Sequence, residues 1–176
     1  GEIFNYTQIQ EENQFKLYSK SDCEIIIHMY LKFGIEKTLE QLNGDYAFFI
    51  FDKNKNKKII ARDPFGVRSL YLGETENKSI VFASELKSLH KLCTKIEPFK
   101  PGTFVELINN TKTINYIPFY HYNYKMIENF NLTEVTQTIK SKLEKAVDIR
   151  LISDRPIGCL LSGGLDSSII ASILSK

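Results

Sequence analysis

One segment limits the possible folds more than any other: the run DYAFFIFD at residues 45–52. It is rich in aromatic and β-branched residues, which favours a strand, and neither of its alternating faces is polar. Both faces of such a strand are shielded from water only when other layers cover them. The sequence therefore predicts a sheet that lies between two covering layers.

Helical patterns stand on both sides of a glycine shortly before this segment. Apolar residues recur at helical spacing over 25–33, and Gly34 is a natural stop for that helix. A shorter helix is expected over 35–42. Ser21 and Glu24 have the spacing of a capping box, in which each side chain bonds the other residue's backbone N–H at a helix start.

Short strand patterns fill most of the chain up to residue 116. The first residues, GEIFNYTQI, predict a strand that runs into a polar turn. Ser84 is expected to cap a short helix over 85–90, and Asn109-Asn110 to form the tip of a hairpin. Further strands are expected at 58–62, 69–72, 79–83, 103–107 and 113–116.

The remainder of the chain has a different pattern. A connector without clear period leads to a long helix over about 133–149, a buried strand over 157–161, and a helical run over 169–174. We therefore expect an α+β protein with two domains, 1–125 and 126–176.

Charge gives no reason to expect a nucleic-acid or membrane partner, because 23 basic residues nearly balance 21 acidic ones. No segment approaches the ~18 apolar residues that a membrane span requires.

The cysteines are sparse and odd in number (Cys23, Cys93 and Cys159). They fit neither a disulfide framework nor a zinc spacing, which favours a reducing, cytoplasmic setting. Cys93 and Cys159 are expected to be buried as small apolar residues. The three histidines are scattered and form no metal-binding pattern.

The segment SGGLDSS at 162–168 lies between the predicted buried strand and the last helical run. A strand that turns through glycines into a helix directs backbone N–H groups and the positive end of the helix dipole at one spot, which suits a phosphate. Gly163 and Gly164 allow positive φ and close approach, the serines offer hydroxyl donors, and Asp166 could hold Mg²⁺. The segment matches neither GxxxxGK[ST] nor GxGxxG nor GxSxG. A serine- and glycine-rich turn that only caps a helix remains the alternative.

This segment closely resembles the pyrophosphatase loop of ATP-dependent adenylating amidotransferases. The wider stretch RLISDRPIGCLLSGGLDSS, at 150–168, looks like that of the glutamine-hydrolysing asparagine synthetases in particular. GEIFNY resembles a motif of the same family, with Phe4 where the family has tyrosine. Other segments look like family landmarks in the expected order: SDCEII (21–26), LNGDYAF (42–48), ARDPFGVRSLY (61–71), FASELKSL (82–89) and EPFKPGTF (97–104).

The resemblance implies a fold and a division of the chain. Residues 1–125 would form a type 2 glutamine amidotransferase domain lacking its N-terminal portion, with the αββα sandwich of the N-terminal nucleophile (Ntn) hydrolases. Residues 126–176 would begin an α/β ATP-pyrophosphatase (PP-loop) domain of the synthetase.

The resemblance also implies site residues. Gly1 would contribute its backbone N–H to an oxyanion hole, and Glu2 and Asp22 would lie in the glutamine pocket. From the residues alone, Asp22 is only a first-turn helix acid, and Arg62-Asp63 is an ion-paired turn between strands. Leu161 would contact the nucleotide, and the pyrophosphate cradle would consist of Ser162, Gly163, Gly164, Leu165, Asp166, Ser167 and Ser168.

By this resemblance the function is ATP-dependent synthesis of L-asparagine from L-aspartate, with ammonia from glutamine, through β-aspartyl-AMP. ATP and Mg²⁺ are the implied cofactors, aspartate and glutamine the further substrates, and a homodimer is compatible with the family. The nucleophile of the family is an N-terminal cysteine, a role that none of these residues can fill. We therefore expect an internal fragment that does not itself hydrolyse glutamine.

Two alternatives remain open. A β-lactam-synthetase-like enzyme would share the loop but carry an inactive glutaminase domain. The retention of Gly1-Glu2 and Ser21-Asp22 argues against it, because an inactive pocket does not need them. The second alternative is a paralogue that binds nucleotide or partners without catalysis.

Overall fold

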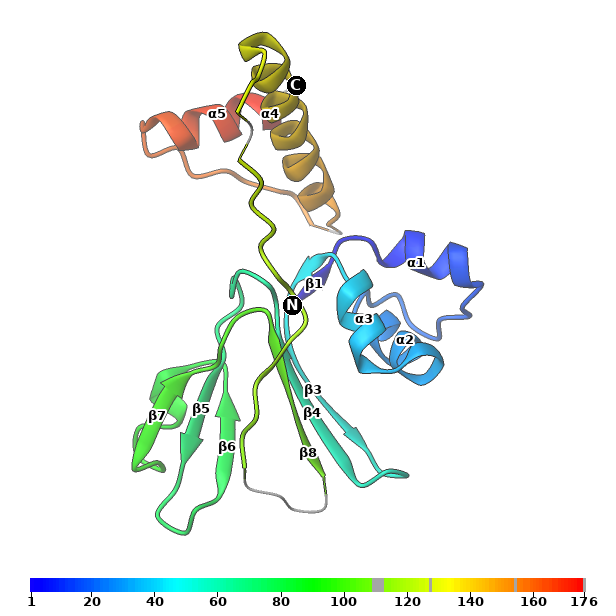
Figure 1. Cartoon of the computed structure of the whole chain (residues 1–176), viewed down its shortest axis with the longest axis vertical. Helices are drawn as coiled ribbons and strands as arrows, with labels where there is room; N and C mark the ends of the chain where they lie inside the picture. The colour runs from blue at the N-terminus through cyan, green and yellow to red at the C-terminus, as the bar shows by residue number, and fades with distance from the viewer. Residues whose placement is uncertain (109–112, 127, 154, 176) are drawn as a thin grey trace. The chain divides into compact units, whose positions relative to one another are not determined.

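The computed structural model of the chain describes residues 1–108, 113–126, 128–153 and 155–175 (Figure 1). The chain divides into two compact units, Gly1–Tyr122 and Asn123–Lys176. The predicted domain boundary after residue 125 stays a prediction. No helix in the described ranges is long and apolar enough to cross a membrane.

Three helices of the first unit precede its sheets: α1 (Tyr6–Asn13), α2 (Glu24–Phe33) and α3 (Ile35–Gln41). The second and third confirm the predicted helices, with Gly34 between them at φ 80°. The first was not predicted. Its sequence, YTQIQEEN, buries only Ile9, so it shows no apolar stripe for periodicity to detect.

The predicted capping box does not form. Cys23 is the N-cap residue of α2 and makes no side-chain capping bond. The Glu24 carboxylate instead accepts hydrogen bonds from the backbone N–H groups of Tyr18 and Ser19, both at 2.7 Å. The Glu24 carboxylate, which the capping-box spacing had assigned to the N-terminus of α2, therefore binds the loop before the helix instead.

Antiparallel strands make up the rest of the first unit. A short pair joins β1 to β2, a four-stranded sheet has the order β3-β4-β8-β9, and a three-stranded sheet has the order β6-β5-β7. The bounds are β1 Glu2–Ile3, β2 Gly44–Asp45, β3 Ala47–Asp52, β4 Lys57–Arg62, β5 Tyr71–Glu74, β6 Ile80–Ala83, β7 Lys95–Pro98, β8 Thr103–Ile108 and β9 Ile117–Pro118.

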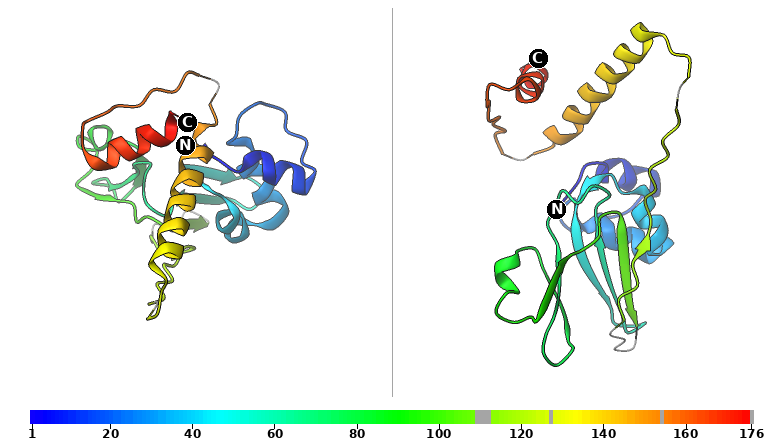
Figure 2. Two further views of the ribbon diagram at one scale, coloured as in Figure 1. Left: turned by 90° about the horizontal axis from the view of Figure 1, so that it is seen from above. Right: turned by 60° about the vertical axis from the view of Figure 1, so that its left-hand side comes forward.

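Strand β4 is buried on both faces. Ile59 and Ala61 belong to the larger core, which contains side chains of all three helices, whereas Ile60 belongs to a second core with Leu70 and Val105. Figures 1 and 2 show the helices on one side of the four-stranded sheet and the three-stranded sheet on the other. The predicted covering layers are therefore present around β4.

Strand β3, on which that prediction rested, is covered less completely. Ile50 is buried in the larger core, but Phe49 and Phe51 on the opposite face are 55% and 45% exposed. The described residues of this unit form one helical layer, the four-stranded and three-stranded sheets, and the short β1–β2 pair. A second helical layer, as in a complete αββα sandwich, is not among them.

Other local predictions need correction. The expected strand over 113–116 is absent, β7 was not predicted, and Asn109-Asn110 lie outside the described residues. The short helix at 85–90 is a single 3₁₀ turn, Leu86–Ser88, without a cap from Ser84.

The second unit contains α4 (Leu132–Asp148), a 3₁₀ turn (Ile149–Leu151) and α5 (Leu165–Leu174). Asn131 caps α4 by accepting the Thr133 N–H at 2.9 Å. The predicted buried strand over 157–161 is wrong: this segment forms neither a strand nor a helix, and Leu160 is 96% exposed. A strand requires a neighbour for its N–H and C=O groups, and no described residue of this unit provides one.

Candidate functional site

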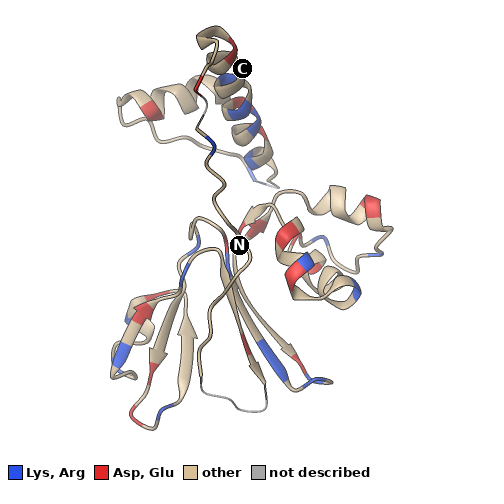
Figure 3. Ribbon diagram, viewed as in Figure 1, with Lys and Arg blue, Asp and Glu red and all other residues tan. Residues whose placement is uncertain are grey.

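Three segments that lie far apart in the sequence meet at the first residues of the chain. The Asp22 carboxylate, just before α2, accepts a hydrogen bond from the Ile3 N–H at 2.6 Å. The guanidinium of Arg68, in the turn after β4, lies 3.5 Å from the Glu2 carboxylate. Glu2 and Asp22, which the family resemblance assigned with Gly1 to one pocket, are thus both brought to β1. Figure 3 shows acidic residues on the short β1–β2 pair.

Gly1 lies against the strand pair so closely that a side chain would not fit. A Cβ at this position would be 2.9 Å from the Asp45 carbonyl oxygen and 3.0 Å from Tyr46 Cα. A Cβ at Gly44, on the partner strand, would come still closer to main chain, at 2.2 Å from the Glu2 carbonyl oxygen. The glycines allow the backbones to approach, which leaves main-chain groups rather than side chains at the surface of this site.

The turn at 62–68 is held by two side chains, although not by the ion pair expected between them. Arg62 donates to the carbonyl oxygens of Arg68, Phe99 and Gly66 at 2.7, 2.7 and 2.8 Å. Asp63 is 1% exposed and accepts from the N–H groups of Phe65, Val67 and Arg68 at 2.9–3.0 Å. Both charges therefore bind main-chain groups of the turn.

Cys23 is adjacent to the same site but is not suited to nucleophilic attack. Its Sγ lies 3.8 Å from the Gly1 carbonyl oxygen. Burial, and then the neighbouring Asp22 carboxylate, raises the pKa of the thiol. A protonated thiol is a poor nucleophile. Cys93 is half-buried, whereas Cys159 is exposed, contrary to the prediction that it is buried.

The segment at 162–168, predicted to bind phosphate, leads into the start of α5. Gly163 has φ 81° and no atom within 4 Å of its Cβ position, and Gly164 is the N-cap of the helix. The first backbone N–H groups of α5 have no acceptor within the helix. The loop therefore has both the open space and the donors that an anion requires.

The hydroxyls of this loop bond one another and one carbonyl. Ser167 and Ser168 donate to the Gly164 oxygen at 3.0 and 2.8 Å, and the Ser162 and Ser167 hydroxyls lie 2.9 Å apart. A hydroxyl rotates easily, so each can turn to a phosphate oxygen without a change in the backbone.

Asp166 and Leu161 flank the loop and are both exposed. Figure 3 shows a single acidic band on α5, which is Asp166, and no basic residue on this helix. No described residue bonds the Asp166 carboxylate, which fits a role as a ligand of a phosphate-bound cation. Within the described ranges, no three His, Cys, Asp or Glu side chains gather into a metal site.

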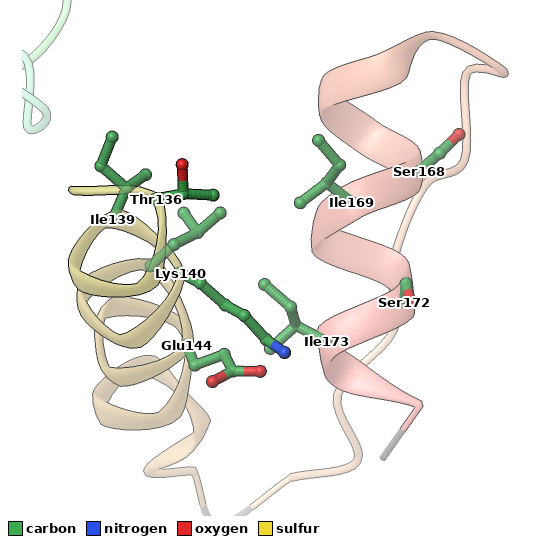
Figure 4. A pocket seen from close by; sticks show the side chains of 9 residues that line it. Thr136, Ile139, Lys140, Glu144, Ser168, Ile169, Ser172 and Ile173 are labelled. Atoms are coloured by element: carbon green, nitrogen blue, oxygen red, sulfur yellow. The ribbon is translucent and has the colours of Figure 1, made fainter. Parts of the chain in front are cut away.

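An apolar groove of about 440 Å³ separates α4 from α5. Figure 4 shows Ile169 and Ile173 turned toward α4, with Lys140 extended across the gap. Ile169 is 40% exposed.

Comparison with known proteins identifies this arrangement. Residues 1–147 match the family described as glutamine amidotransferase domain, and residues 138–176 match the family described as asparagine synthase.

The chain belongs to the glutamine amidotransferase family.

Relatives of this amidotransferase chain match it over its whole length. A probable glutamine-hydrolysing asparagine synthetase of Dictyostelium discoideum is 38% identical over 187 residues, and the corresponding enzymes of mouse and human are each 36% identical over 197. The chain covers 32% of the first relative and 35% of the other two. It therefore spans about one-third of the length of these proteins.

Solved amidotransferase structures share the fold. Glutamine phosphoribosylpyrophosphate amidotransferase from B. subtilis superposes with a TM-score of 0.57 at 24% identity, covering 69% of this chain and 28% of its own. An allosteric regulatory enzyme of purine biosynthesis gives the same TM-score at 26% identity, with 69% and 27% covered. These neighbours confirm the predicted Ntn-type α+β fold of the amidotransferase unit.

One residue that lies beside Glu2 was not singled out from the sequence. Arg68 was noted only as part of the segment ARDPFGVRSLY. The tight turn from Arg62 to Gly66 could suggest that Arg68, two residues further on, is held in a fixed position. Only the fold, however, brings Arg68 to Glu2, because the two are separated by 66 positions.

Proposed function

We propose that the whole protein is a glutamine-hydrolysing asparagine synthetase, in which this chain supplies glutamine-binding residues and the loop for ATP. One observation carries the proposal: Gly1, Glu2 and Asp22 meet at one site in a chain that also carries a glycine loop at a helix N-terminus. The synthetases that match the whole chain support it.

Glutamine is a zwitterion with an amide tail, so its site needs an acid for the ammonium group and donors for the oxyanion that forms at the amide. Glu2 binds the ammonium group. Asp22 adds negative charge and fixes the backbone just after Glu2 through the Ile3 N–H. The Gly1 N–H donates to the oxyanion of the tetrahedral intermediate, where such a donor has its largest effect. Hydrolysis releases ammonia.

The second unit holds ATP. Main-chain N–H groups of the Ser162–Ser168 loop and the start of α5 bind the pyrophosphate part, and Leu161 lies beside the nucleotide. Asp166 would hold Mg²⁺, which neutralises phosphate charge when it is bound. These roles are supported by the open space at Gly163 and by the Asp166 carboxylate, which bonds none of the residues that the structure describes.

The reaction needs ATP because a carboxylate is a poor electrophile. An oxygen of the aspartate side chain attacks the α-phosphorus of ATP, which forms β-aspartyl-AMP and releases pyrophosphate. Ammonia then attacks the β-carbonyl carbon, the bond to AMP breaks, and a proton is lost to give asparagine. The products are asparagine, AMP and pyrophosphate, with glutamate from the first site.

The deciding experiment incubates the intact gene product with ATP, Mg²⁺ and aspartate, and with either glutamine or ammonia. We expect asparagine and AMP from both nitrogen sources, and no AMP when aspartate is omitted. Synthesis with ammonia but not with glutamine would contradict the assignment of a glutaminase site. AMP formation without asparagine would favour the β-lactam-synthetase-like alternative, and ATP binding without turnover would favour a non-catalytic paralogue.

Two matched variants test the ATP loop. Asp166→Asn removes the first-turn acid of α5 and is expected to raise the ATP and Mg²⁺ concentrations needed for AMP formation. Glu134→Gln removes the first-turn acid of α4, which is outside the loop, and is expected to leave them unchanged. Equal behaviour of the two variants would contradict the assignment of Asp166.

A further inference from the structure

We propose that Arg68 is a positioning residue for glutamine, acting through the carboxylate of Glu2. The inference rests on the proposed function, because it takes Glu2 as the residue that binds the ammonium group of glutamine. The contact that suggests it is the 3.5 Å approach between the Arg68 guanidinium and Glu2 Oε1.

The main chain of Arg68 is fixed on both sides. Its N–H donates to Asp63 Oδ2 at 3.0 Å, and its carbonyl oxygen accepts from Arg62 Nε at 2.7 Å. Charged hydrogen bonds of this kind are among the stronger ones in proteins, and Asp63 is buried. Only the side chain of Arg68 is therefore left to adjust.

The turn that carries Arg68 admits little variation. Gly66 has φ 67°, and a Cβ there would be 2.8 Å from Pro101 Cγ and 3.0 Å from Arg62 Cζ. A turn that merely joined β4 to β5 would not need a buried carboxylate, a guanidinium bonded to three carbonyls and a left-handed glycine. This construction fits a turn that must hold one side chain in place.

Glu2, by contrast, is held loosely by its own surroundings. It lies on a two-residue strand, and its side chain is 58% exposed. A free glutamate side chain samples many rotamers, and ordering it on binding costs free energy. The Arg68 guanidinium at Oε1 restricts the carboxylate and leaves Oε2 available for the substrate ammonium group.

The small free energy that an exposed ion pair adds to folding favours a positioning role for Arg68 over a structural one. The Arg68 side chain is 47% exposed, and exposed pairs add little to folding stability. The pair should therefore affect glutamine binding and leave the melting temperature almost unchanged. This difference separates a positioning role from a merely structural one.

The test uses the intact protein and measures glutamate release from glutamine. We expect Arg68→Gln to raise KM for glutamine about three- to fivefold with little change in kcat. Arg68→Lys, which keeps the charge, should recover part of this loss. Ammonia-dependent asparagine synthesis should be unchanged in both variants. Lys87→Gln, which breaks the exposed Lys87–Glu85 pair elsewhere on the surface, is the matched control and should behave as the unmodified protein.

A double-mutant cycle on kcat/KM for glutamine then tests whether Arg68 acts through Glu2. Arg68→Gln should have no further effect once Glu2→Gln is present. An unchanged KM in Arg68→Gln, or a full effect that persists in the Glu2→Gln background, would overturn the inference. The inference would also be overturned if Arg68→Gln lowered both the rate of ammonia-dependent synthesis and the melting temperature. If the unmodified protein releases no glutamate, the proposed function itself fails; if it does and Arg68→Gln matches it, only this inference fails.

Discussion

The carboxylate of Asp22 accepts a hydrogen bond from the backbone N–H of Ile3, 19 residues earlier in the chain, at 2.6 Å. This bond joins the start of α2 to β1, the short strand that carries Glu2. One side chain thus links the helical layer to the residues assigned to glutamine. Its replacement should therefore affect both the stability of the first unit and the geometry of the site.

We predict that Asp22→Ala lowers the free energy of unfolding by about 1–2 kcal/mol, because a partly buried N–H loses a charged acceptor. Asp22→Asn, which keeps an acceptor oxygen, should lose less. Urea unfolding followed by circular dichroism measures the difference. Glu36→Ala, in the first turn of α3, is the control and should cost less than Asp22→Ala. Equal losses for these two alanine variants would contradict the role of the Ile3 bond.

Gly66→Ala should be strongly destabilising, by about 1–3 kcal/mol, since φ is positive at this residue and the new Cβ meets Pro101 and Arg62. Gly158→Ala is the matched control, because nothing lies within 4 Å of its Cβ position. The melting temperatures of the two variants should differ clearly. A Gly66→Ala protein as stable as Gly158→Ala would show that the turn can relax.

Two buried tyrosines should respond oppositely to removal of the hydroxyl. The Tyr46 hydroxyl is buried with no partner among the described residues, so Tyr46→Phe should leave stability unchanged or raise it. The Tyr30 hydroxyl donates to the Asp52 carboxylate at 2.7 Å, so Tyr30→Phe should lose about 1 kcal/mol or more. Chemical denaturation of both variants gives the comparison. A clear loss in Tyr46→Phe would reveal a partner for that hydroxyl.

Glu24 should make the loop before α2 sensitive to acid. The Ser19 hydroxyl, followed by the Tyr18 N–H, lowers the pKa of Glu24 from its ordinary value of 4.5 to about 2. A lowered pKa means that the stabilisation is complete above pH 4.5 and is lost as the pH falls toward 2. The protection of the Tyr18 and Ser19 amides against exchange, taken relative to the intrinsic exchange rate at each pH, should therefore fall in this window. In Glu24→Gln the protection should show no such step; a step of the same size would assign it to another group.

The helices and strands with strong periodicity could be predicted from the sequence, and those defined by context could not. The segment 25–33 has an apolar stripe and a glycine stop, so α2 was predicted nearly to its ends. The first helix has one buried residue, and β7 is a short strand whose pairing with β5 identifies it. The strand predicted over 157–161 has the composition of a strand but no neighbour to pair with in the described residues.

In the candidate sites, too, features set by local sequence could be predicted, whereas features set by tertiary contacts could not. Glycines before a helix indicate an anion site through local geometry alone, so the residues suffice to predict one at 162–168, and it stays a prediction. Asp22 looked like an ordinary helix acid, and only resemblance placed it with Glu2. Arg68 was missed because its position depends on the packing of β4 between two cores and on the bonds from Arg62 and Asp63.

The double burial of β4 also limits how related chains can differ in length. Adding or deleting one residue within this strand would exchange Ile59 and Ile60 between the two cores. It would also move the following turn relative to β1 and take Arg68 away from Glu2. Insertions and deletions should therefore gather in the β3–β4 hairpin turn at 53–56, whereas the spacing from Ile60 to Arg68 should be the same wherever Glu2 is kept.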